Sequence, residues 1–381
     1  MPFFSFSINE ISPPLKKFNI TANNLYFSKN TELWRILNKE NSSFINSLNQ
    51  ETRYPVKSIS KKKILFFLPP SIGLGDAVEY ASAIKKISET IFFEEVAVAS
   101  TGDYTFLFQD CFELESTYSY IIKKTEMDKF DTIFHLTLEI KNLVNQKYFR
   151  TNIFEEIIKF FNIKNTIKNK IAVQKKYKIK KISIFPLSSS PIRTMPIQIL
   201  NELIKILLKN YNLEIFLDRN SEISNFLYNN INVNKSFIVD PKNKSELLSL
   251  IKNIEYGLFM DSGPLHVAKM YNKRGLLLET SVSSSILLKN YKLIKGMENK
   301  FSSFFCEAPC GLTDIFNYNN SYGCYDSLKI KTTKLKKNNF KNIINRGVKN
   351  YYLENIKKPV SCASSLNVQN IYNAIKKDLS L

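Results

Sequence analysis

Short apolar runs, each followed by a polar turn and then by a helical pattern, recur along the chain from residue 61 onward. The first run spans residues 64–69, and a glycine-bearing loop at 72–75 leads from it into apolar positions at helical spacing over 76–89. This strand, turn and helix form the opening unit of a doubly wound sheet. The same patterns predict strands at 96–100 and 132–136 and a helix at 153–161.

A second series of the same kind begins at residue 182. It predicts strands at 182–186, 213–217 and 237–239, helices at 200–208 and 222–228, and a helix that Ser245 caps and that runs through Ile251. Two consecutive series predict an α/β protein with two Rossmann-like, doubly wound domains. We place the junction in the lysine-rich stretch 164–181. The expected parts are an N-terminal extension at 1–60, a first domain at 61–175, a second at 176–300, and a cysteine-bearing insertion with a C-terminal helix at 301–381.

The segment from Tyr256 to Met270 combines an apolar strand, a polar turn and the start of a helix. Proline at 264 suits a first helical turn, glycine at 263 lets the backbone approach a ligand, and Asp261 or Ser262 can cap the helix. A helix N-terminus that follows a strand offers free N–H groups and a positive dipole end, which suits a phosphate. His266, one of only two histidines in the chain, falls on this first turn.

Composition agrees with a globular protein of two domains. The 381 residues are 44% hydrophobic and 13% aromatic, which is enough to fill two cores and argues against a disordered or fibrous chain. The apolar runs are too short to span a bilayer, and the N-terminus lacks the basic and apolar regions of a signal peptide. We therefore expect a cytoplasmic protein.

The net charge of +20 has two interpretations. The lysines are scattered along the chain, which is typical of solvated surface lysines and of an AT-rich coding bias. A scattered excess still creates a positive field that attracts phosphorylated substrates or an anionic membrane surface. Charge alone does not separate the two, and we expect no nucleic-acid partner.

The five cysteines are Cys111, Cys306, Cys310, Cys324 and Cys362. An odd number in a cytoplasmic chain argues against a disulfide framework. The spacing of the last four leaves a zinc or other metal site open, although it lacks the paired CxxC geometry of common structural sites. Ordinary thiols are the other interpretation, and we expect no metal site.

Three ordered motifs carry a family resemblance. Residues 261–268 read D-S-G-P-L-H-V-A, and they match the pattern D-[ST]-G-x-x-H-x-A at every defined position. Gly75-Asp76 with Ala83-Ile84-Lys85 resembles an early Gly-Asp loop and its helix, and Phe185-Pro186 with Arg193-Thr194-Met195-Pro196 resembles a strand end and a basic-x-Trp-Pro element. Over residues 62–290 the chain thus resembles glycosyltransferase family 9, the heptosyltransferases of lipopolysaccharide core synthesis and their relatives.

The resemblance implies a GT-B fold, in which two Rossmann-like domains face a cleft, and an inverting transfer that needs no metal and no cofactor beyond the nucleotide-sugar donor. Helix N-termini and cationic side chains would then stabilise the leaving diphosphate. The acceptor would be a lipopolysaccharide or another surface glycan at the inner face of the membrane, where peripheral contact with anionic lipid fits the positive charge. The donor-binding residues implied are Ser188, Arg193, Asp261, Ser262, Gly263, Pro264 and His266.

Asp76 resembles the loop aspartate to which the family assigns the role of general base, which takes the proton of the acceptor hydroxyl. The other interpretation is that Asp76 caps the helix that follows it. One carboxylate can do both.

Three stretches depart from the family pattern. Leu187-Ser188-Ser189-Ser190 stands where small residues and glycine are usual, Met195 replaces a tryptophan, and Leu278-Glu279-Thr280-Ser281-Val282 replaces the Phe-Gly-x-Thr loop of the donor pocket. Two alternatives stay open. One is a catalytically silent nucleotide- or sugar-binding module, which the altered loop at 278–282 favours, and the other is a different activity of the GT-B fold, a nucleotide-sugar epimerase.

Overall fold

The computed structural model describes two compact units. One comprises Met1–Lys141 and Ile153–Thr166, and the other comprises Asn142–Asn152 and Ile167–Leu381. The described residues within them are 3–7, 24–28, 46–49, 56–68, 72–100, 104–114, 116–118, 124–139, 152–164, 179–219, 221–289, 291–304, 306–315, 323–324, 326 and 348–380. Most of the expected extension and the boundary at 175 and 176 lie outside these residues, so the division into parts stays a prediction.

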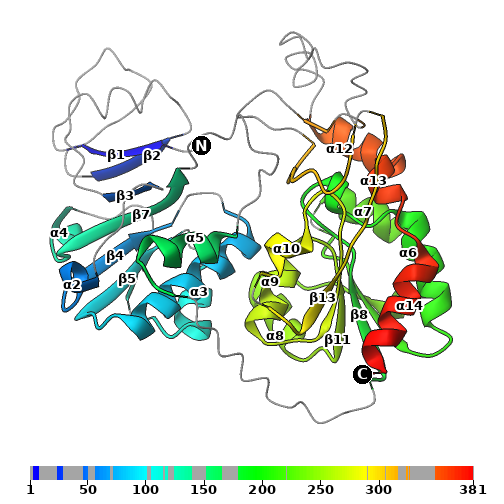
Figure 1. The fold of residues 1–381 in the computed structure, drawn as a ribbon, viewed down its shortest axis with the longest axis horizontal. Coiled ribbons are helices and arrows are strands. Elements are labelled where there is room, and N and C mark those ends of the chain that lie inside the picture. The colour runs from blue at the N-terminus through cyan, green and yellow to red at the C-terminus, as the bar shows by residue number, and fades with distance from the viewer. Residues whose placement is uncertain are drawn as a thin grey trace, which may run out of the picture. The chain divides into compact units, whose positions relative to one another are not determined.

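A parallel five-stranded sheet in the order β3-β7-β4-β5-β6 forms the centre of the first unit (Figure 1). The strands and helices predicted here are confirmed, and β3, which lies in the expected extension, adds an edge strand beside β7. A separate antiparallel pair joins β1 to β2. The elements are β1 (Phe3–Ser7), β2 (Asn24–Ser28), β3 (Asn46–Asn49), α2 (Val56–Ile59), β4 (Lys63–Phe67), α3 (Leu74–Thr90), β5 (Glu95–Ala99), a π-helical turn (Leu107–Cys111), β6 (Ser116–Tyr118), α4 (Lys124–Met127), β7 (Thr132–Glu139) and α5 (Ile153–Phe160).

Burial explains why these elements pack as they do. β4 is central in its sheet, and its apolar run from Ile64 to Phe67 is fully buried. The rings of Phe66, Phe134 and Phe161 pack against one another and join β4 and β7 to the end of α5. The buried Glu79 on α3 accepts the Ile153 N–H at 2.9 Å, so a carboxylate fixes the positive end of α5 on α3.

The second unit is built on a parallel six-stranded sheet in the order β10-β9-β8-β11-β12-β13. This is the strand order 3-2-1-4-5-6 of the Rossmann fold. The elements are β8 (Lys181–Phe185), a 3₁₀ turn (Pro191–Arg193), α6 (Ile197–Leu207), β9 (Asn212–Phe216), α7 (Glu222–Asn230), a 3₁₀ turn (Lys235–Phe237), β10 (Ile238–Val239), α8 (Lys244–Lys252), β11 (Tyr256–Phe259), α9 (Gly263–Met270), β12 (Gly275–Leu278), α10 (Ser284–Leu287), β13 (Ile294–Met297), α12 (Val348–Lys357), α13 (Ser361–Ser364) and α14 (Val368–Leu379).

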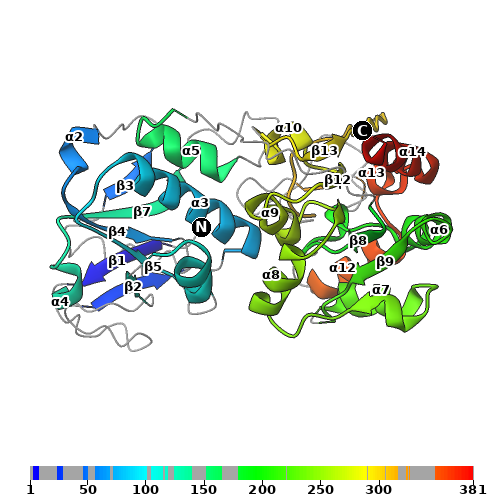
Figure 2. The same cartoon turned by 90° about the horizontal axis from the view of Figure 1, so that it is seen from below.

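The helices lie on both faces of this sheet (Figures 1 and 2). Alternate strand residues point to opposite faces, so Ile182 and Ile184 of β8 join the core that α6 and α14 cover. Phe185 stacks between Phe216 and Phe259, with ring centroids 4.3 and 5.0 Å apart. Side chains from both sides of β8 are therefore buried, as expected for a central strand with helices on both faces of its sheet.

In this unit one expected helix cap is wrong, and one expected strand is confirmed over two of its three residues. Asn243, and not Ser245, caps α8, because the Asn243 side chain accepts the Glu246 N–H at 2.9 Å and the helix already begins at Lys244. Of the strand expected at 237–239 only Ile238–Val239 is extended, since Lys235–Phe237 form a 3₁₀ turn. No helix in the described part of the chain has the length and hydropathy needed to cross a membrane.

The C-terminal helix is held to the sheet by a buried carboxylate. Asp378 of α14 pairs with Lys295 of β13 and lies 4.0 Å from the Arg274 guanidinium, which also donates to the Asp378 carbonyl at 2.8 Å. Burial first, and the charge of Asp378 next, raise the pKa of Tyr256 well above its ordinary value. We infer that this group anchors α14.

Replacing Asp378 with asparagine should lower the free energy of unfolding by about 2–3 kcal/mol, because two cations lose their buried charged partner. Urea unfolding followed by circular dichroism measures the change. Lys377→Ala, at the exposed neighbouring position, should change it by no more than about 0.5 kcal/mol. An equal effect of the two substitutions would contradict an anchoring role.

Candidate functional site

The strand order of the second sheet reverses between β8 and β11. The chain proceeds from β8 through β9 to β10 on one side and from β11 through β12 to β13 on the other. The carboxyl ends of β8 and β11 are joined, since the Met260 N–H donates to the Phe185 carbonyl at 3.3 Å. Ligands of open α/β sheets bind outside the strand ends at such a reversal. Both predicted donor motifs begin at these two strand ends.

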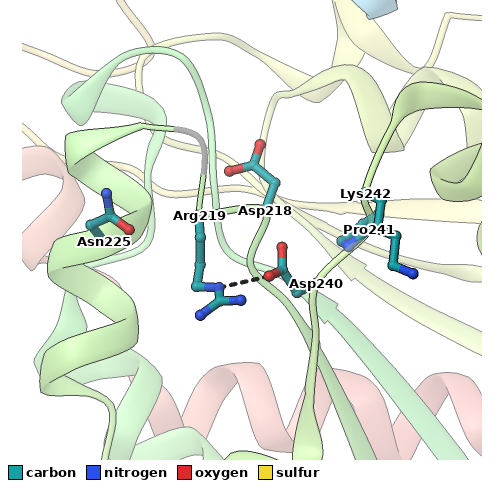
Figure 3. A pocket seen from close by; sticks show the side chains of 6 residues that line it. All are labelled: Asp218, Arg219, Asn225, Asp240, Pro241 and Lys242. Atoms are coloured by element: carbon teal, nitrogen blue, oxygen red, sulfur yellow. Dashed lines mark hydrogen bonds and ion pairs between the residues drawn. The ribbon is translucent and has the colours of Figure 1, made fainter.

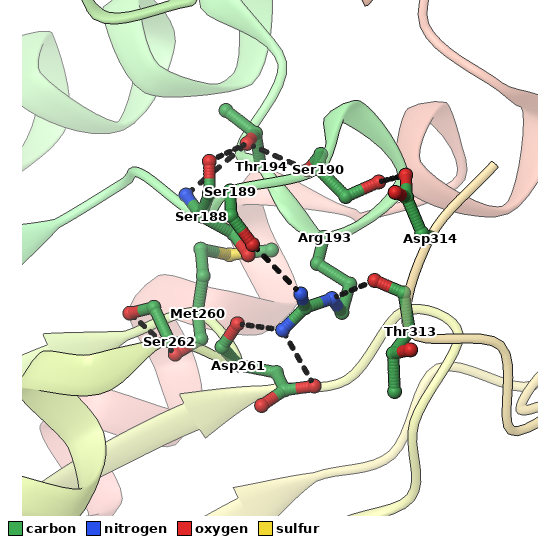
Figure 4. Close-up of polar contacts among 10 residues, drawn as sticks. All are labelled: Ser188, Ser189, Ser190, Arg193, Thr194, Met260, Asp261, Ser262, Thr313 and Asp314. Carbon is green, nitrogen blue, oxygen red and sulfur yellow. Dashed lines mark hydrogen bonds and ion pairs between the residues drawn. The ribbon is translucent and has the colours of Figure 1, made fainter. Parts of the chain in front are cut away.

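Arg193 ties the two loops together (Figure 4). Its Nη1 donates to the Asp261 carbonyl at 2.8 Å and lies 3.2 Å from the Asp261 carboxylate. Its Nε donates to the Thr313 carbonyl at 2.6 Å, and its Nη2 donates to the Ser189 hydroxyl at 3.2 Å. The Arg193 and Asp261 side chains are only 13% and 6% exposed. In this arrangement the guanidinium orients the turn after β11 and neutralises its carboxylate.

The turn after β11 leads directly into α9. Ser262 occupies the N-cap position, but its hydroxyl donates back to the Met260 carbonyl at 3.3 Å. Ser262 therefore stands at the expected N-cap but makes no side-chain cap hydrogen bond, and Arg193 engages the Asp261 carboxylate instead. No side chain among the described residues caps this helix. Its positive end, with Gly263 and Pro264 in the first turn, can receive an anion.

Ser188 and His266 differ in their surroundings. The Ser188 hydroxyl is buried and has no hydrogen-bond partner within the described residues, whereas buried hydroxyls normally have one. The Ser188 N–H donates to the Thr194 hydroxyl at 3.2 Å, which holds the loop after β8. His266 is only 2% exposed and lies on the buried side of α9. The predicted binding residues therefore lie at the adjoining carboxyl ends of β8 and β11. His266 is the most deeply buried of them.

Asp76 belongs to the first unit. It occupies the third position of α3, immediately after β4 and its loop, and its carboxylate accepts the Gly73 N–H at 3.4 Å. The helix begins at Leu74, inside the expected loop, and Asp76 at its third position satisfies the free N–H of Gly73, the residue before the helix. The first sheet reverses its strand order between β4 and β7, so Asp76 also stands at the strand ends where such sheets bind ligands.

A pocket lies at the carboxyl ends of β9 and β10 (Figure 3). Its volume is about 410 Å³, and its lining is Asp218, Arg219, Asn225, Asp240, Pro241 and Lys242. Arg219 donates to Asp240 at 2.6 Å and lies over the Tyr228 ring, 5.0 Å from its centroid. None of the sequence motifs predicted this pocket. Its signal was Asp218, an acid directly after the second strand of a Rossmann-like sheet, where ribose hydroxyls are bound.

Four of the cysteines lie near one another: Cys306, Cys310 and Cys324 come from one stretch of the chain, and Cys362 comes from a more distant one. Burial, and next the neighbouring thiols, raise the pKa of Cys306 to about 12. The same causes raise the pKa of Cys362, in the order burial, Cys324, Cys310 and Cys306. Such thiols stay protonated and unreactive at neutral pH. Within the described residues, no group of three or more His, Cys, Asp or Glu side chains is placed so that it could hold a metal ion.

Comparison with known proteins identifies the architecture. No family model matches the sequence, and no curated protein matches it. A glycosyltransferase of family 9 from Veillonella parvula matches in structure with a TM-score of 0.50 and 9% identity, over 84% of this chain and 98% of that one. The chain has a GT-B-like fold. The iron-containing dodecameric glycosyltransferase TibC of enterotoxigenic E. coli H10407 also matches, with a TM-score of 0.50 and 10% identity over 84% of this chain and 77% of TibC.

The expected resemblance to family 9 glycosyltransferases is thus confirmed at the level of the fold. E. coli ADP-heptose lipopolysaccharide heptosyltransferase II matches over 62% of this chain and 90% of its own, with a TM-score of 0.44 and 12% identity. The orientation of the two domains across a cleft stays a prediction.

Proposed function

We propose that the protein is an inverting, metal-independent glycosyltransferase. It moves a sugar of the heptose class from a nucleotide-sugar to a lipopolysaccharide or another surface glycan. The second unit binds the donor, and the first unit presents the acceptor. Transfer takes place in the cytoplasm, where the positive charge of the protein favours peripheral contact with the anionic inner membrane.

The observation that carries this proposal is the start of α9 at the reversal point of the second sheet. A nucleotide-sugar carries a diphosphate, and this helix presents its positive end with no side-chain cap among the described residues. The diphosphate is also the leaving group, so the same N–H groups and dipole stabilise the charge that grows as the sugar departs. The buried Ser188 hydroxyl supplies a further hydrogen bond to a ligand at this place.

The pocket at β9 and β10 supports a nucleoside at the same edge of the sheet. Two carboxylates, Asp218 and Asp240, line it, and carboxylates accept hydrogen bonds from ribose hydroxyls. Its volume of about 410 Å³ lies within the range of small-molecule sites. A nucleoside in this pocket would direct its phosphates toward the start of α9, between β8 and β11, where the strand order reverses.

A screen for donor binding tests the function. Thermal unfolding is measured with ADP-, GDP-, UDP- and CMP-sugars, with and without a chelator, for the wild type and for Ser188→Ala. We expect one nucleotide class to raise the melting temperature without added metal, and Ser188→Ala to reduce that rise.

Ser249→Ala removes a hydroxyl from an exposed position of α8 and serves as the matched control, with an unchanged rise. If every nucleotide-sugar leaves the melting temperature of the wild type unchanged, the proposed function is wrong. Release of free sugar isomers from donor alone would favour an epimerase, and binding without transfer to any acceptor would favour a silent module.

A further inference from the structure

We propose that Asp314 is a positioning residue of the donor site, and that the tail segment Gly311–Ile315 forms one wall of that site. The inference rests on the proposed function, since it concerns how the same site is held in shape. The segment lies in the expected insertion, outside the stretch that resembles family 9. It contacts the site loops at three places.

The first contact is with Arg193. The Thr313 carbonyl accepts from the Arg193 Nε at 2.6 Å, which is shorter than the bond from Nη1 to the Asp261 carbonyl. A guanidinium is a rigid planar fork, so fixing one edge of it fixes the direction of the others. The tail therefore orients the cation that holds the turn before α9.

The second contact is made by Asp314 (Figure 4). Its carboxylate accepts the Ser190 hydroxyl at 2.7 Å and the Ile315 N–H at 2.6 Å, and it also accepts the Tyr352 hydroxyl from α12. Ser190 is buried, and its carbonyl accepts the Thr194 hydroxyl at 3.0 Å. Asp314 thus joins the loop after β8, the tail and α12 through one charged group.

The third contact is with the loop after β12, the stretch that departs from the family pattern. The Gly311 N–H donates to the Ser281 carbonyl at 2.6 Å. The neighbouring residues Glu279, Thr280 and Ser281 are all buried polar residues, and the Glu279 carboxylate accepts the Ser284 N–H at the start of α10 at 2.6 Å. The tail therefore spans from the end of β12 to the end of β8, across the strand end that carries α9.

Apolar packing holds the tail in this place. Leu312 and Ile315 are buried in a cluster with Ile192, which precedes Arg193, and with Val360 and Ala363 near α13. The altered loop and the added tail are bonded to each other, so we infer that they replace the family's donor loop together. Asp314 acts on the donor only through Ser190, Arg193 and the loops that these residues fix.

The test compares Asp314→Ala and Asp314→Asn with the wild type. Isothermal titration with ADP, GDP and UDP first identifies the nucleoside diphosphate that the wild type binds. For Asp314→Ala we expect about a tenfold rise in the Kd of that nucleotide and in the donor KM, because the charged hydrogen bond that holds the Ser190 loop is lost together with those to Ile315 and Tyr352, with kcat changed less than twofold. Asparagine keeps one acceptor oxygen for Ser190, so Asp314→Asn should recover most of the affinity.

Hydrogen exchange of residues 188–194 provides a readout that needs no ligand. We expect faster exchange there in Asp314→Ala and wild-type exchange in Thr313→Val, because only the carbonyl of Thr313 is used. Unchanged exchange in Asp314→Ala, or an unchanged Kd where the wild type binds a nucleotide, overturns the positioning role. A wild type that binds none of the nucleotides overturns the proposed function instead, and the positioning role is then decided by exchange alone.

Discussion

Asp76→Asn should lower kcat by about 10²–10⁴-fold, the usual contribution of a general base, while the Kd for the donor stays unchanged. Asparagine has nearly the same shape, and its side-chain oxygen can still accept the Gly73 N–H that Asp76 accepts at 3.4 Å. The substitution therefore removes the base and keeps the helix cap. Rates with saturating donor and acceptor, together with titration of the donor alone, measure the two effects separately.

Glu89→Gln is the matched control, since Glu89 is exposed near the other end of the same helix. It should leave both kcat and the donor Kd at their wild-type values. If Asp76→Asn retains wild-type turnover, Asp76 is only a cap, and the general base must be sought elsewhere. If it loses donor binding as well, the separation of roles between the two units is wrong.

Arg193→Ala should lower the free energy of unfolding by about 3–5 kcal/mol, the cost of leaving one partner of a buried ion pair behind. The partner is Asp261, whose side chain is 6% exposed and lies 3.2 Å from the guanidinium. Donor binding should fall at the same time, since the turn before α9 loses its anchor. Urea unfolding and nucleotide titration at a temperature where the variant stays folded measure the two effects.

Arg219→Ala provides the contrast, because the Arg219 side chain is 49% exposed in its pair with Asp240. Solvent screens such a pair, so we expect a far smaller loss of stability. The free energy of unfolding of Arg193→Lys should lie between those of the wild type and Arg193→Ala. A lysine keeps the charge but cannot make all four contacts that the planar guanidinium makes. Equal stability of Arg193→Ala and the wild type would show that the four contacts do not hold the loops.

Local sequence patterns predicted the central strands of both sheets and most of the longer helices, whereas β6, β12, β13 and α12 were not predicted. The apolar run at 182–186 predicted β8 as a strand, and the structure shows that Ile182 and Ile184 face one side of it and Phe185 the other. The helix expected at the C-terminus is observed as α14. Caps were predicted less well, because Asn243 and Ser245 are equally good candidates by residue type and only the backbone geometry selects one of them.

The sequence motifs around the site could be recognised, but the contacts that their residues make with distant segments could not be predicted. The sequence predicted Arg193 and Asp261 as separate ligand contacts, whereas the structure pairs them with each other. The pocket at Asp218 and Asp240 was missed because its two sides come from strands that become neighbours only in the sheet. Nothing in a linear pattern indicates that the Thr313 carbonyl meets Arg193, since any residue has a carbonyl.

The sequence by itself determined the α/β class, the two series of strands and helices, and the turn at 261–268 that begins α9. These features depend on apolar spacing and on residues with local conformational preferences, so each can be predicted from a short continuous segment of the sequence. Only the tertiary structure decided that a tail from residues 311–315 closes the site and that Asp378 anchors the last helix. Those contacts join residues up to 124 positions apart. The free energy that selects them comes from burying apolar surface and from pairing each charge that is buried with it.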